Sequence, residues 1–286
     1  VFEVACAAEL VSAYTREYLN REGVKKPVIS SACPTITRLI STNYPYLCEN
    51  IMPILPPIDV AAKLAREKAL AEHPELKPED IGIIFISPCP AKVSYIKNNF
   101  SGERNYISAA LSFNEVYFAL IDVMKKTDDD PEESTDSGII GIGWASTGGE
   151  SSAILNEKYL AADGIENCIK VLDEIENGTI HNLEFVELNA CPAGCVGGAM
   201  VVENPFVAKA RLQTLRRYLP VSQTQLHGDE REYIPDKYFF DELPTYMPIQ
   251  RLSTNFGESL RMMAVIQKLS EALPGIDCGA CGAPTC

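Results

Sequence analysis

Three of the ten cysteines in this 286-residue chain are followed directly by proline, where random order would give fewer than one such pair. They are Cys33-Pro34, Cys89-Pro90 and Cys191-Pro192, and each follows a strand-like apolar run. Proline fixes its own φ angle and holds the preceding residue extended, so each pair would end a strand and place a thiol at its tip. Ligands bind at strand ends in open α/β sheets, and the three thiols are therefore expected to converge.

The third of these segments adds a fourth thiol. Residues 187–198 read Glu-Leu-Asn-Ala-Cys-Pro-Ala-Gly-Cys-Val-Gly-Gly, which places Cys195 four residues after Cys191, one turn if a helix starts there. Glycines 194, 197 and 198 are expected to let the backbone approach a bulky inorganic group. Four thiolates from three segments are the ligand set of a 4Fe–4S cluster, whereas most free cysteines are simply buried small side chains. The Cys-Pro pattern and the glycine-rich turn favour the cluster.

The end of the chain carries a second cysteine motif. Cys278 and Cys281 form a CxxC pair, and Cys286 follows five residues later. This spacing is typical of an iron–sulfur site, and a zinc site is the alternative. Three ligands are present, so the fourth is expected either beyond this sequence or from elsewhere in the protein.

Composition excludes several classes of protein. Hydrophobic residues make up 46 % of the chain, enough for a substantial core of one or two domains. The formal net charge of −14 argues against nonspecific nucleic-acid binding and against anionic lipid surfaces. The longest apolar run, residues 81–86, has the length of a strand, so no membrane insertion is expected. The cysteine content without a secretory context favours metal or redox use in a reducing, cytoplasmic setting.

The apolar patterns alternate between strand and helix, which indicates an α/β fold. Strands are expected near residues 1–5, 27–32, 81–87, 138–144 and 184–190. Helices are expected near residues 7–21, 58–72, 113–126, 150–162, 206–218 and 255–273. Asp59 is the expected N-cap of the second helix. The chain begins at Val1 within an expected strand, which suggests a fragment, and residues 127–137 are expected to form an acidic solvated loop.

We expect three parts along the chain. Residues 1–205 would form the cysteine-bearing domain, 206–275 a helical extension with a polar linker, and 276–286 the start of a 4Fe–4S module. The helix at 255–273 carries an apolar stripe of Met262, Val265, Ile266, Leu269 and Leu273. The stripe is expected to be core packing that docks the small module, and a partner-binding face is the alternative.

The cysteine segments and their order resemble the FeFe hydrogenase active-site domain over about residues 1–205. Residues 30–34 (SSACP), 87–92 (SPCPAK) and 187–198 are similar to that family's three motifs, which read roughly TSCCP, MPCxxK and ExMxCxxGCxxGGG. Residues 2–10 and the segment 147–149 (TGG) resemble two further family stretches. The resemblance implies a domain in which strand-end ligands lie between two sheet lobes, with a helical C-terminal extension here.

The resemblance also implies a cofactor, the H-cluster. Cys33, Cys89, Cys191 and Cys195 would hold its 4Fe–4S cubane. Cys195 would bridge to a two-iron subsite that carries CO, cyanide and an azadithiolate, and Lys92 would donate a hydrogen bond to a cyanide. Such a group splits H2 into a hydride and a proton, so H2 and protons would be the substrates.

Several positions depart from the family pattern. Where the family's enzymes have a proton-relay cysteine, this chain has Ala32, and Ser87 and Asn189 replace motif methionines. The two relay glutamates correspond to Thr15 and Tyr18. Slow turnover is expected, because a general acid or base is typically worth about 10²- to 10⁴-fold in rate.

These departures resemble the sensory branch of the family, in which a CGxCGxPTC iron–sulfur module is appended, as at residues 278–286. A redox or signalling protein is then the expected partner, and a homodimer is possible. One alternative is an iron–sulfur protein without the two-iron subsite, similar to cluster-assembly proteins. Another is an electron-transfer module that uses both clusters without a substrate.

Overall fold

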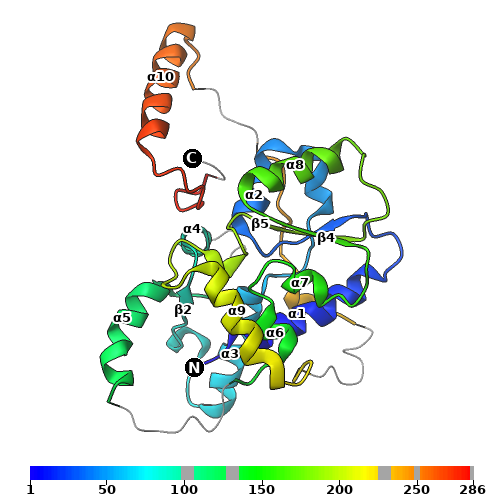
Figure 1. Ribbon diagram of the computed structural model, residues 1–286, viewed down its shortest axis with the longest axis vertical. Coiled ribbons are helices and arrows are strands. Elements are labelled where there is room, and N and C mark those ends of the chain that lie inside the picture. The colour runs from blue at the N-terminus through cyan, green and yellow to red at the C-terminus, as the bar shows by residue number, and fades with distance from the viewer. Residues whose placement is uncertain (98–105, 127–134, 225–232, 248–251, 284–286) are drawn as a thin grey trace.

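The computed structural model describes residues 1–97, 106–126, 135–224, 233–247 and 252–283 (Figure 1). Its strands form two parallel sheets, so the fold is mixed α/β. The first sheet has the order β1-β5-β4 and the second pairs β2 with β3. The strands are β1 (Val28–Ile29), β2 (Ile84–Ser87), β3 (Ala109–Ser112), β4 (Tyr159–Asp163) and β5 (Phe185–Asn189).

Helices connect and cover these strands (Figure 1). The α-helices are α1 (Val4–Leu19), α2 (Pro34–Asn43), α3 (Pro57–Glu72), α4 (Pro90–Lys97), α5 (Phe113–Met124), α6 (Ile139–Gly143), α7 (Gly149–Ser152), α8 (Ile165–Glu176), α9 (Pro205–Leu215) and α10 (Phe256–Ala272). The 3-10 turns are η1 (Pro45–Asn50), η2 (Pro78–Asp80), η3 (Cys195–Gly197), η4 (Arg216–Tyr218) and η6 (Asp236–Tyr238). Among the described residues, no helix combines the length and the apolar character needed to cross a membrane.

The first sheet is built around β5, whose first four residues are all buried. It pairs in parallel with β1 on one side and with β4 on the other. Apolar residues of α2 and α8 cover it, including Ile36, Leu39 and Leu172. A central strand that is buried on both faces needs a near-continuous apolar run, which β5 supplies except at Glu187 and at its last residue, Asn189.

The second sheet is small and open. β2 and β3 pair in parallel from Ile84 with Ala109 to Ser87 with Ser112. Each strand is buried only at its last residue, while Ile84, Ile86 and Leu111 are exposed. The buried cluster beside this sheet contains only Ile58, Ala62, Ile96 and Ile107 among the described residues.

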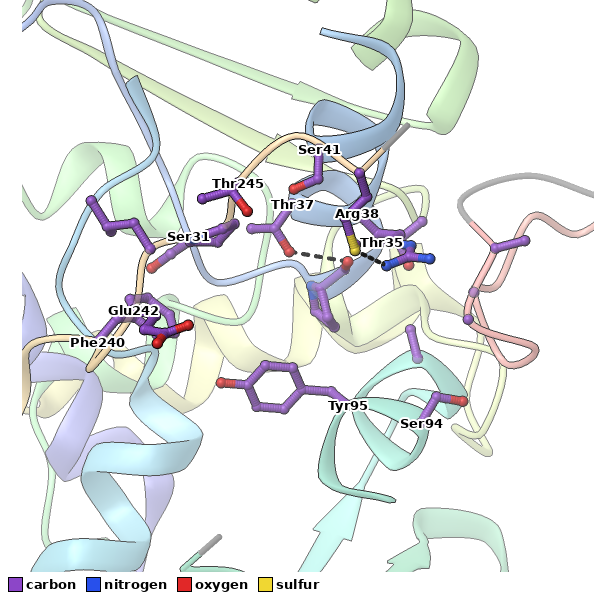
Figure 2. Close-up of a pocket in the computed structure, with 18 residues that line it drawn as sticks. Ser31, Thr35, Thr37, Arg38, Ser41, Ser94, Tyr95, Phe240, Glu242 and Thr245 are labelled. Carbon is purple, nitrogen blue, oxygen red and sulfur yellow. Dashed lines mark hydrogen bonds between the residues drawn. The ribbon is translucent and has the colours of Figure 1, made fainter. Parts of the chain in front are cut away.

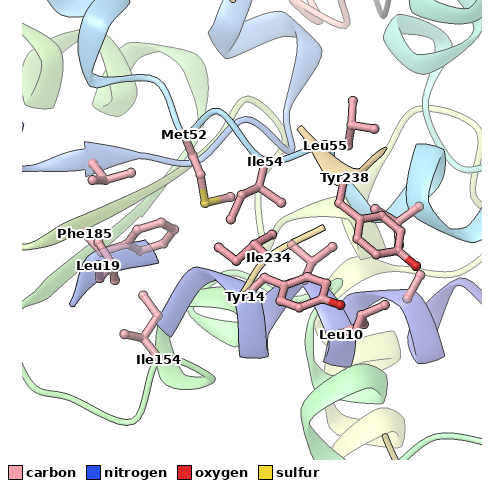
Figure 3. Packing of buried hydrophobic residues seen from close by; sticks show 14 of the residues in the cluster. Leu10, Tyr14, Leu19, Met52, Ile54, Leu55, Ile154, Phe185, Ile234 and Tyr238 are labelled. Atoms are coloured by element: carbon pink, nitrogen blue, oxygen red, sulfur yellow. The ribbon is translucent and has the colours of Figure 1, made fainter. Parts of the chain in front are cut away.

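The largest buried cluster joins α1 and α3 to the first sheet (Figure 3). Tyr14 of α1 packs against Tyr238, with ring centroids 5.4 Å apart. Phe185 of β5 and Ile234 also belong to this cluster, so residues from both ends of the chain share one core.

Several expected elements are confirmed and others are wrong. The helices near 7–21, 58–72, 113–126, 206–218 and 255–273 form, and the strands near 27–32, 81–87 and 184–190 form in shortened versions. Residues 1–5 are not a strand, because α1 begins at Val4. Residues 138–144 form α6, and 150–162 contains the short α7 followed by β4. Glycine at position 141 lets α6 pack closely on α1, because a Cβ there would lie 2.3 Å from the carbonyl oxygen of Ala5.

Two finer expectations are also corrected. Asp59 is not the N-cap of α3, since the helix begins at Pro57 with Pro56 as cap, and Asp59 lies buried in the first turn. The apolar stripe of α10 is not core packing here, because its residues are between 42 % and 60 % exposed. The expected acidic loop at 127–137 lies mostly outside the described residues.

Candidate metal centre

The Cys-Pro segments stand at the carboxyl ends of three strands, as the sequence predicts. Cys33 follows β1 and caps the N-terminus of α2, with Pro34 as the first helical residue. Cys89 follows β2 directly before α4, which begins at Pro90. Cys191 follows β5. Proline suits the first turn of a helix, where its missing N–H is not needed, so each of the first two pairs turns a strand into a helix.

The four thiols converge from the two sheets. Burial is the main cause that raises the pKa of Cys191 to about 12, and the charges of Cys33, Cys89 and Cys195 add to it. Burial likewise raises the pKa of Cys33, against a smaller opposing effect of Lys92. Thiols held protonated in this way must release protons when they bind metal.

Lys92 lies among these thiols, on the first turn of α4. Its Nζ donates to Cys195 Sγ over 3.6 Å. Burial alone lowers the pKa of the Lys92 ammonium, but the surrounding thiolates, led by Cys195, outweigh burial and raise that pKa above its ordinary value. A buried cation therefore faces a group of anionic sulfurs, which is the complementarity that an anionic cluster requires.

The loop from Cys191 to Cys195 is clamped on both sides. Asp163, at the end of β4, accepts a hydrogen bond from the backbone N–H of Ala193 over 3.1 Å. The carbonyl of Ala193 accepts a hydrogen bond from the N–H of Thr147. Gly194 forms an isolated antiparallel β-bridge with Ser146. The two thiols of this loop are thus positioned by chain segments about 30 and 45 residues away in sequence.

The glycines of this loop have a different role from the expected one. A Cβ on Gly197 would lie 2.0 Å from the carbonyl oxygen of Pro192, and one on Gly198 would lie 2.2 Å from that of Pro88. A Cβ on Gly194, at φ 85°, would lie 2.7 Å from the N of Thr147. Glycine at these positions therefore lets other backbone segments of the protein pack against the loop. No α-helix starts at Cys191, and the loop ends in the 3-10 turn η3.

The positions that depart from the family motifs have local structural roles. The Ser87 hydroxyl donates to the Cys89 carbonyl and accepts from the Cys89 N–H, so it fixes the backbone that carries the thiol. Asn189 donates to Glu187 Oε1 over 2.8 Å. Ala32, in the relay position, carries no titratable group, and its N–H donates to Ser30 Oγ.

Two buried carboxyls that the sequence analysis did not select lie near the site: Glu187 is four residues before Cys191, and Glu150 interacts electrostatically with Lys92. Glu187 of β5 accepts from the N–H groups of Gly148 and Ser151 and from Asn189. Glu150 of α7 accepts from Ser30 Oγ over 2.6 Å, while its Oε1 is buried with no hydrogen-bond partner.

The two carboxyls are unequal. Burial, followed by the charge of Glu187, raises the pKa of Glu150 well above its ordinary value, against opposing effects of Ser30 and Lys92. Burial also raises the pKa of Glu187, but its backbone donors favour the charged form. The proton shared by the pair therefore belongs on Glu150, whose unpartnered oxygen can carry it. Only the Gly148-Gly149 turn directly before Glu150 hinted at this position in the sequence.

The C-terminal motif is only partly described. Cys278 is half-buried and Cys281 is exposed, while Cys286 lies outside the described residues. Of the other cysteines, Cys168 is fully buried and donates to the carbonyl of Asn189, and Cys48 is also buried.

The thiols fit a cluster better than a single ion. Within the described parts of the chain, no three or more His, Cys, Asp or Glu side chains are grouped to hold one metal ion. The four thiols interact electrostatically with one another and with Lys92, and this set of groups suits the charge of an anionic cluster. The unpartnered Glu150 oxygen further indicates room for a polar group nearby.

The fold and the site define a cysteine-lined α/β protein whose thiols stand at the ends of parallel strands. The family model described as "Iron only hydrogenase large subunit, C-terminal domain" matches residues 1–162 and 148–199. The chain belongs to this family.

Curated relatives fall into two kinds. A periplasmic Fe hydrogenase large subunit of Nitratidesulfovibrio vulgaris is 26 % identical over 255 residues, covering 72 % of this chain and 59 % of the relative. A probable cytosolic Fe-S cluster assembly factor of Drosophila willistoni is 28 % identical over 109 residues, covering 34 % of this chain and 23 % of the relative. The chain thus spans less than two thirds of the length of either relative.

Solved structures agree on the fold. A variant of an FeFe-hydrogenase from Chlamydomonas reinhardtii has a TM-score of 0.57 at 17 % identity, covering 81 % of this chain and 77 % of that chain. A structure that concerns stepwise assembly of the FeFe-hydrogenase H-cluster has a TM-score of 0.55 at 17 % identity, with coverage of 74 % and 73 %. The expected hydrogenase-like α/β fold is confirmed.

Proposed function

We propose that this protein binds an H-cluster and interconverts H2 with protons and electrons at a slow rate, as a sensor of H2. The observation that carries the proposal is the position of the partly buried Lys92 among the four thiols, with its Nζ 3.6 Å from Cys195 Sγ. A structural cubane alone does not need a buried lysine on the side of one ligand. The cation suits a further anionic group beside Cys195.

Each residue then has a role. Cys33, Cys89, Cys191 and Cys195 would hold the 4Fe–4S cubane, and Cys195 would also bridge to the two-iron subsite with its CO, cyanide and azadithiolate ligands. When bound, this cofactor supplies the chemistry 2 H⁺ + 2 e⁻ ⇌ H2. Lys92 would hold the cofactor's anionic ligands by charge and hydrogen bonding.

Protons would move through carboxyls rather than through a cysteine. Ser30 connects the N–H of Ala32 to Glu150, and Glu150 lies within electrostatic range of Lys92 and Glu187. Burial and the charge of Glu187 raise the pKa of Glu150 well above its ordinary value, which favours the protonated form that a general acid needs.

The family's relay positions on α1 offer no substitute. Thr15 donates its hydroxyl to the carbonyl of Val11 and contacts Met52 Sδ, and none of these groups titrates. With Ala32 at the cysteine position and Thr15 and Tyr18 at the glutamate positions, none of the family's three relay residues is present. Slow turnover, which suits sensing by occupancy and redox state, follows from this loss. A redox or signalling protein would receive the output.

A second function is favoured by the assembly-factor relatives. In it the chain would hold iron–sulfur clusters without the two-iron subsite. Infrared spectroscopy separates the two proposals, with protein matured anaerobically and cycled between H2 and argon. CO and cyanide bands that shift with H2 are expected, and Ala32→Cys should then raise turnover.

The absence of such bands in protein that shows intact 4Fe–4S signals by electron paramagnetic resonance would contradict the hydrogenase proposal. Lys92→Met provides a matched test of the site. Its cubane signal should persist, while the CO and cyanide bands should weaken or disappear, because the cation that holds the anionic ligands is gone.

A further inference from the structure

The helix α9 and the turn η4 that follows it carry charge of one sign. Residues 204–224 contain four of the 25 basic residues of the chain and none of its 39 acidic residues. The chain as a whole has a formal net charge of −14, so this segment is basic on an acidic molecule. Figure 1 shows α9 in front of α6, with which it is in contact.

Large apolar side chains are interleaved with these charges. Four of them are between 63 % and 85 % exposed, and two exposed arginines lie among them in the sequence. The guanidinium of Arg217 lies 5.6 Å from the centre of the Tyr218 ring. Aromatic residues and arginine are enriched at the centres of protein interfaces. The six residues, called the α9 surface below, are Phe206, Arg211, Leu215, Arg217, Tyr218 and Val221.

Two other surface features of the described chain combine both signs of charge. The helix α10 is exposed at nearly every residue, and its two basic residues are matched by two glutamates. The cavity of about 320 Å³ between α2, α4 and residues 240–247 is lined by both Arg38 and Glu242 (Figure 2). Neither feature favours a partner of one charge, whereas the α9 surface does.

The N-terminal end of α9 is anchored to the candidate metal centre. Asn204 caps the helix, since its side chain accepts from the N–H of Phe206 over 3.0 Å. A Cβ at Gly197, in the turn that begins at Cys195, would lie 3.2 Å from Pro205 Cβ. This end of α9 therefore packs directly on the turn that carries a candidate cluster ligand.

The C-terminal end of the α9 surface is anchored to a second element of the site. The carbonyls of Pro220 and Val221 accept from the N–H groups of Ile139 and Ile140, where α6 begins. The helix α6 in turn contacts α7, which carries Glu150. A molecule bound to the α9 surface would thus contact a segment whose two ends lead to both parts of the candidate centre.

We propose that the α9 surface is the docking site of a protein partner that presents an acidic segment with apolar anchor residues. Its carboxylates would pair with Arg211 and Arg217, and its apolar side chains would cover the exposed rings beside them. A nucleic-acid backbone or an anionic membrane would extend beyond the four cations onto the acidic remainder of the chain, whereas a short acidic segment would not. The inference goes beyond the proposed function and uses it only to name the partner as the receiver of the signal.

Fluorescence anisotropy with a labelled peptide of glutamate and leucine tests the docking site on the full chain with its iron–sulfur clusters loaded. Binding should saturate, should weaken as salt is raised because screening reduces each charge pair, and should protect residues 205–221 from hydrogen exchange. The double variant Arg211→Glu/Arg217→Glu should weaken binding by about tenfold or more, and Tyr218→Ala by about tenfold.

The matched control is Arg261→Glu/Lys268→Glu, which makes the same change of charge on exposed α10 and should leave binding unchanged. An equal loss in the two double variants would overturn the docking site, as would the absence of saturable binding. Tighter binding of phosphatidylserine vesicles or of single-stranded DNA would assign the surface to another class of partner. Self-association that Arg211→Glu/Arg217→Glu abolishes in sedimentation would make it an interface between copies of the chain. None of these results depends on the CO and cyanide bands, so failure of the docking site and failure of the hydrogenase proposal are distinguishable.

Discussion

The two parallel sheets contribute to one site but differ in how firmly they are held. The first sheet has β5, buried at its first four residues, and a cluster of buried residues from α2, α8 and η1 around it. The second sheet has strands that are largely exposed and a buried cluster of four residues. Cys33, Cys191 and Cys195 belong to the first, and Cys89 and Lys92 follow the second.

Because the two sheets differ in burial, they contribute to the site in different ways. The first sheet and α7, which packs on it, carry three of the four thiols and the buried carboxyls Glu187 and Glu150, so this side fixes geometry and proton affinity. The second supplies one thiol and the cation, joined to the rest mainly through α4 and Ser87. Low local burial favours local opening, so the side that carries Lys92 is where we expect the site to admit its cofactor.

The largest expected effect tests the proton role of the first sheet. Glu150→Gln keeps the hydrogen bond from Ser30 but cannot exchange a proton, so H2 turnover should fall about 10²- to 10⁴-fold. Turnover is measured by H2 evolution with a reduced dye, at matched iron content. Glu115→Gln, an exposed carboxylate that caps α5 beside the second sheet, is the control and should leave the rate unchanged.

An equal loss in both variants would contradict a specific proton role for Glu150. The pH profile adds a second readout. The profile of the unmodified protein should show the titration of a group with a raised pKa, and Glu150→Gln should lose it.

The second prediction compares how much each sheet contributes to the free energy of unfolding. Phe185→Ala empties a fully buried position of β5 and should cost about 3–5 kcal/mol of unfolding free energy. Ile84→Ala, at a position of β2 that is 60 % exposed, should change it by less than about 0.5 kcal/mol. Urea unfolding followed by circular dichroism measures both. Similar costs would show that the second sheet is packed as tightly as the first.

The smallest effect sharpens the electrostatics beside the second sheet. Asp59 is buried in α3 and accepts from Tyr95 of α4 over 2.7 Å. Burial is the leading cause that raises its pKa from 3.8 to about 6, against opposing effects of Tyr95 and Lys63. The folded protein thus binds more protons than the unfolded chain between about pH 4 and 6, and stability falls as pH rises through that window.

Asp59→Asn should remove this pH dependence, because the amide stays neutral and still accepts from Tyr95. The variant should gain up to about 3 kcal/mol at pH 7.5 and close to nothing at pH 4. Urea unfolding at the two pH values checks the difference. Exposed Asp241→Asn is the control, and a gain of equal size at both pH values would show that the charge of Asp59 is not the cause.

Local sequence was a good guide where covalent geometry decides structure. The Cys-Pro pairs were expected at strand ends and are found there, because proline restricts its neighbour whatever the surroundings. Long periodic segments such as α1, α3 and α10 were also predicted, because their apolar spacing matches a helix. Residues 138–144 were predicted as a strand but contain the helix α6. An apolar run with glycines suits either a strand or a tightly packed helix, so the pattern alone did not separate the two.

The sequence by itself thus determined the family, the strand-end positions of the thiols and the loss of the relay at Ala32. Only the tertiary structure decided that Glu150 meets Ser30 across 120 residues, that Gly197 and Gly198 make room for backbone rather than for a cluster, and that Gly279 lies against α2 and α4. The reason is physical. Backbone restriction and periodicity are local properties, whereas burial, proton affinity and close approach arise between segments that only folding brings together.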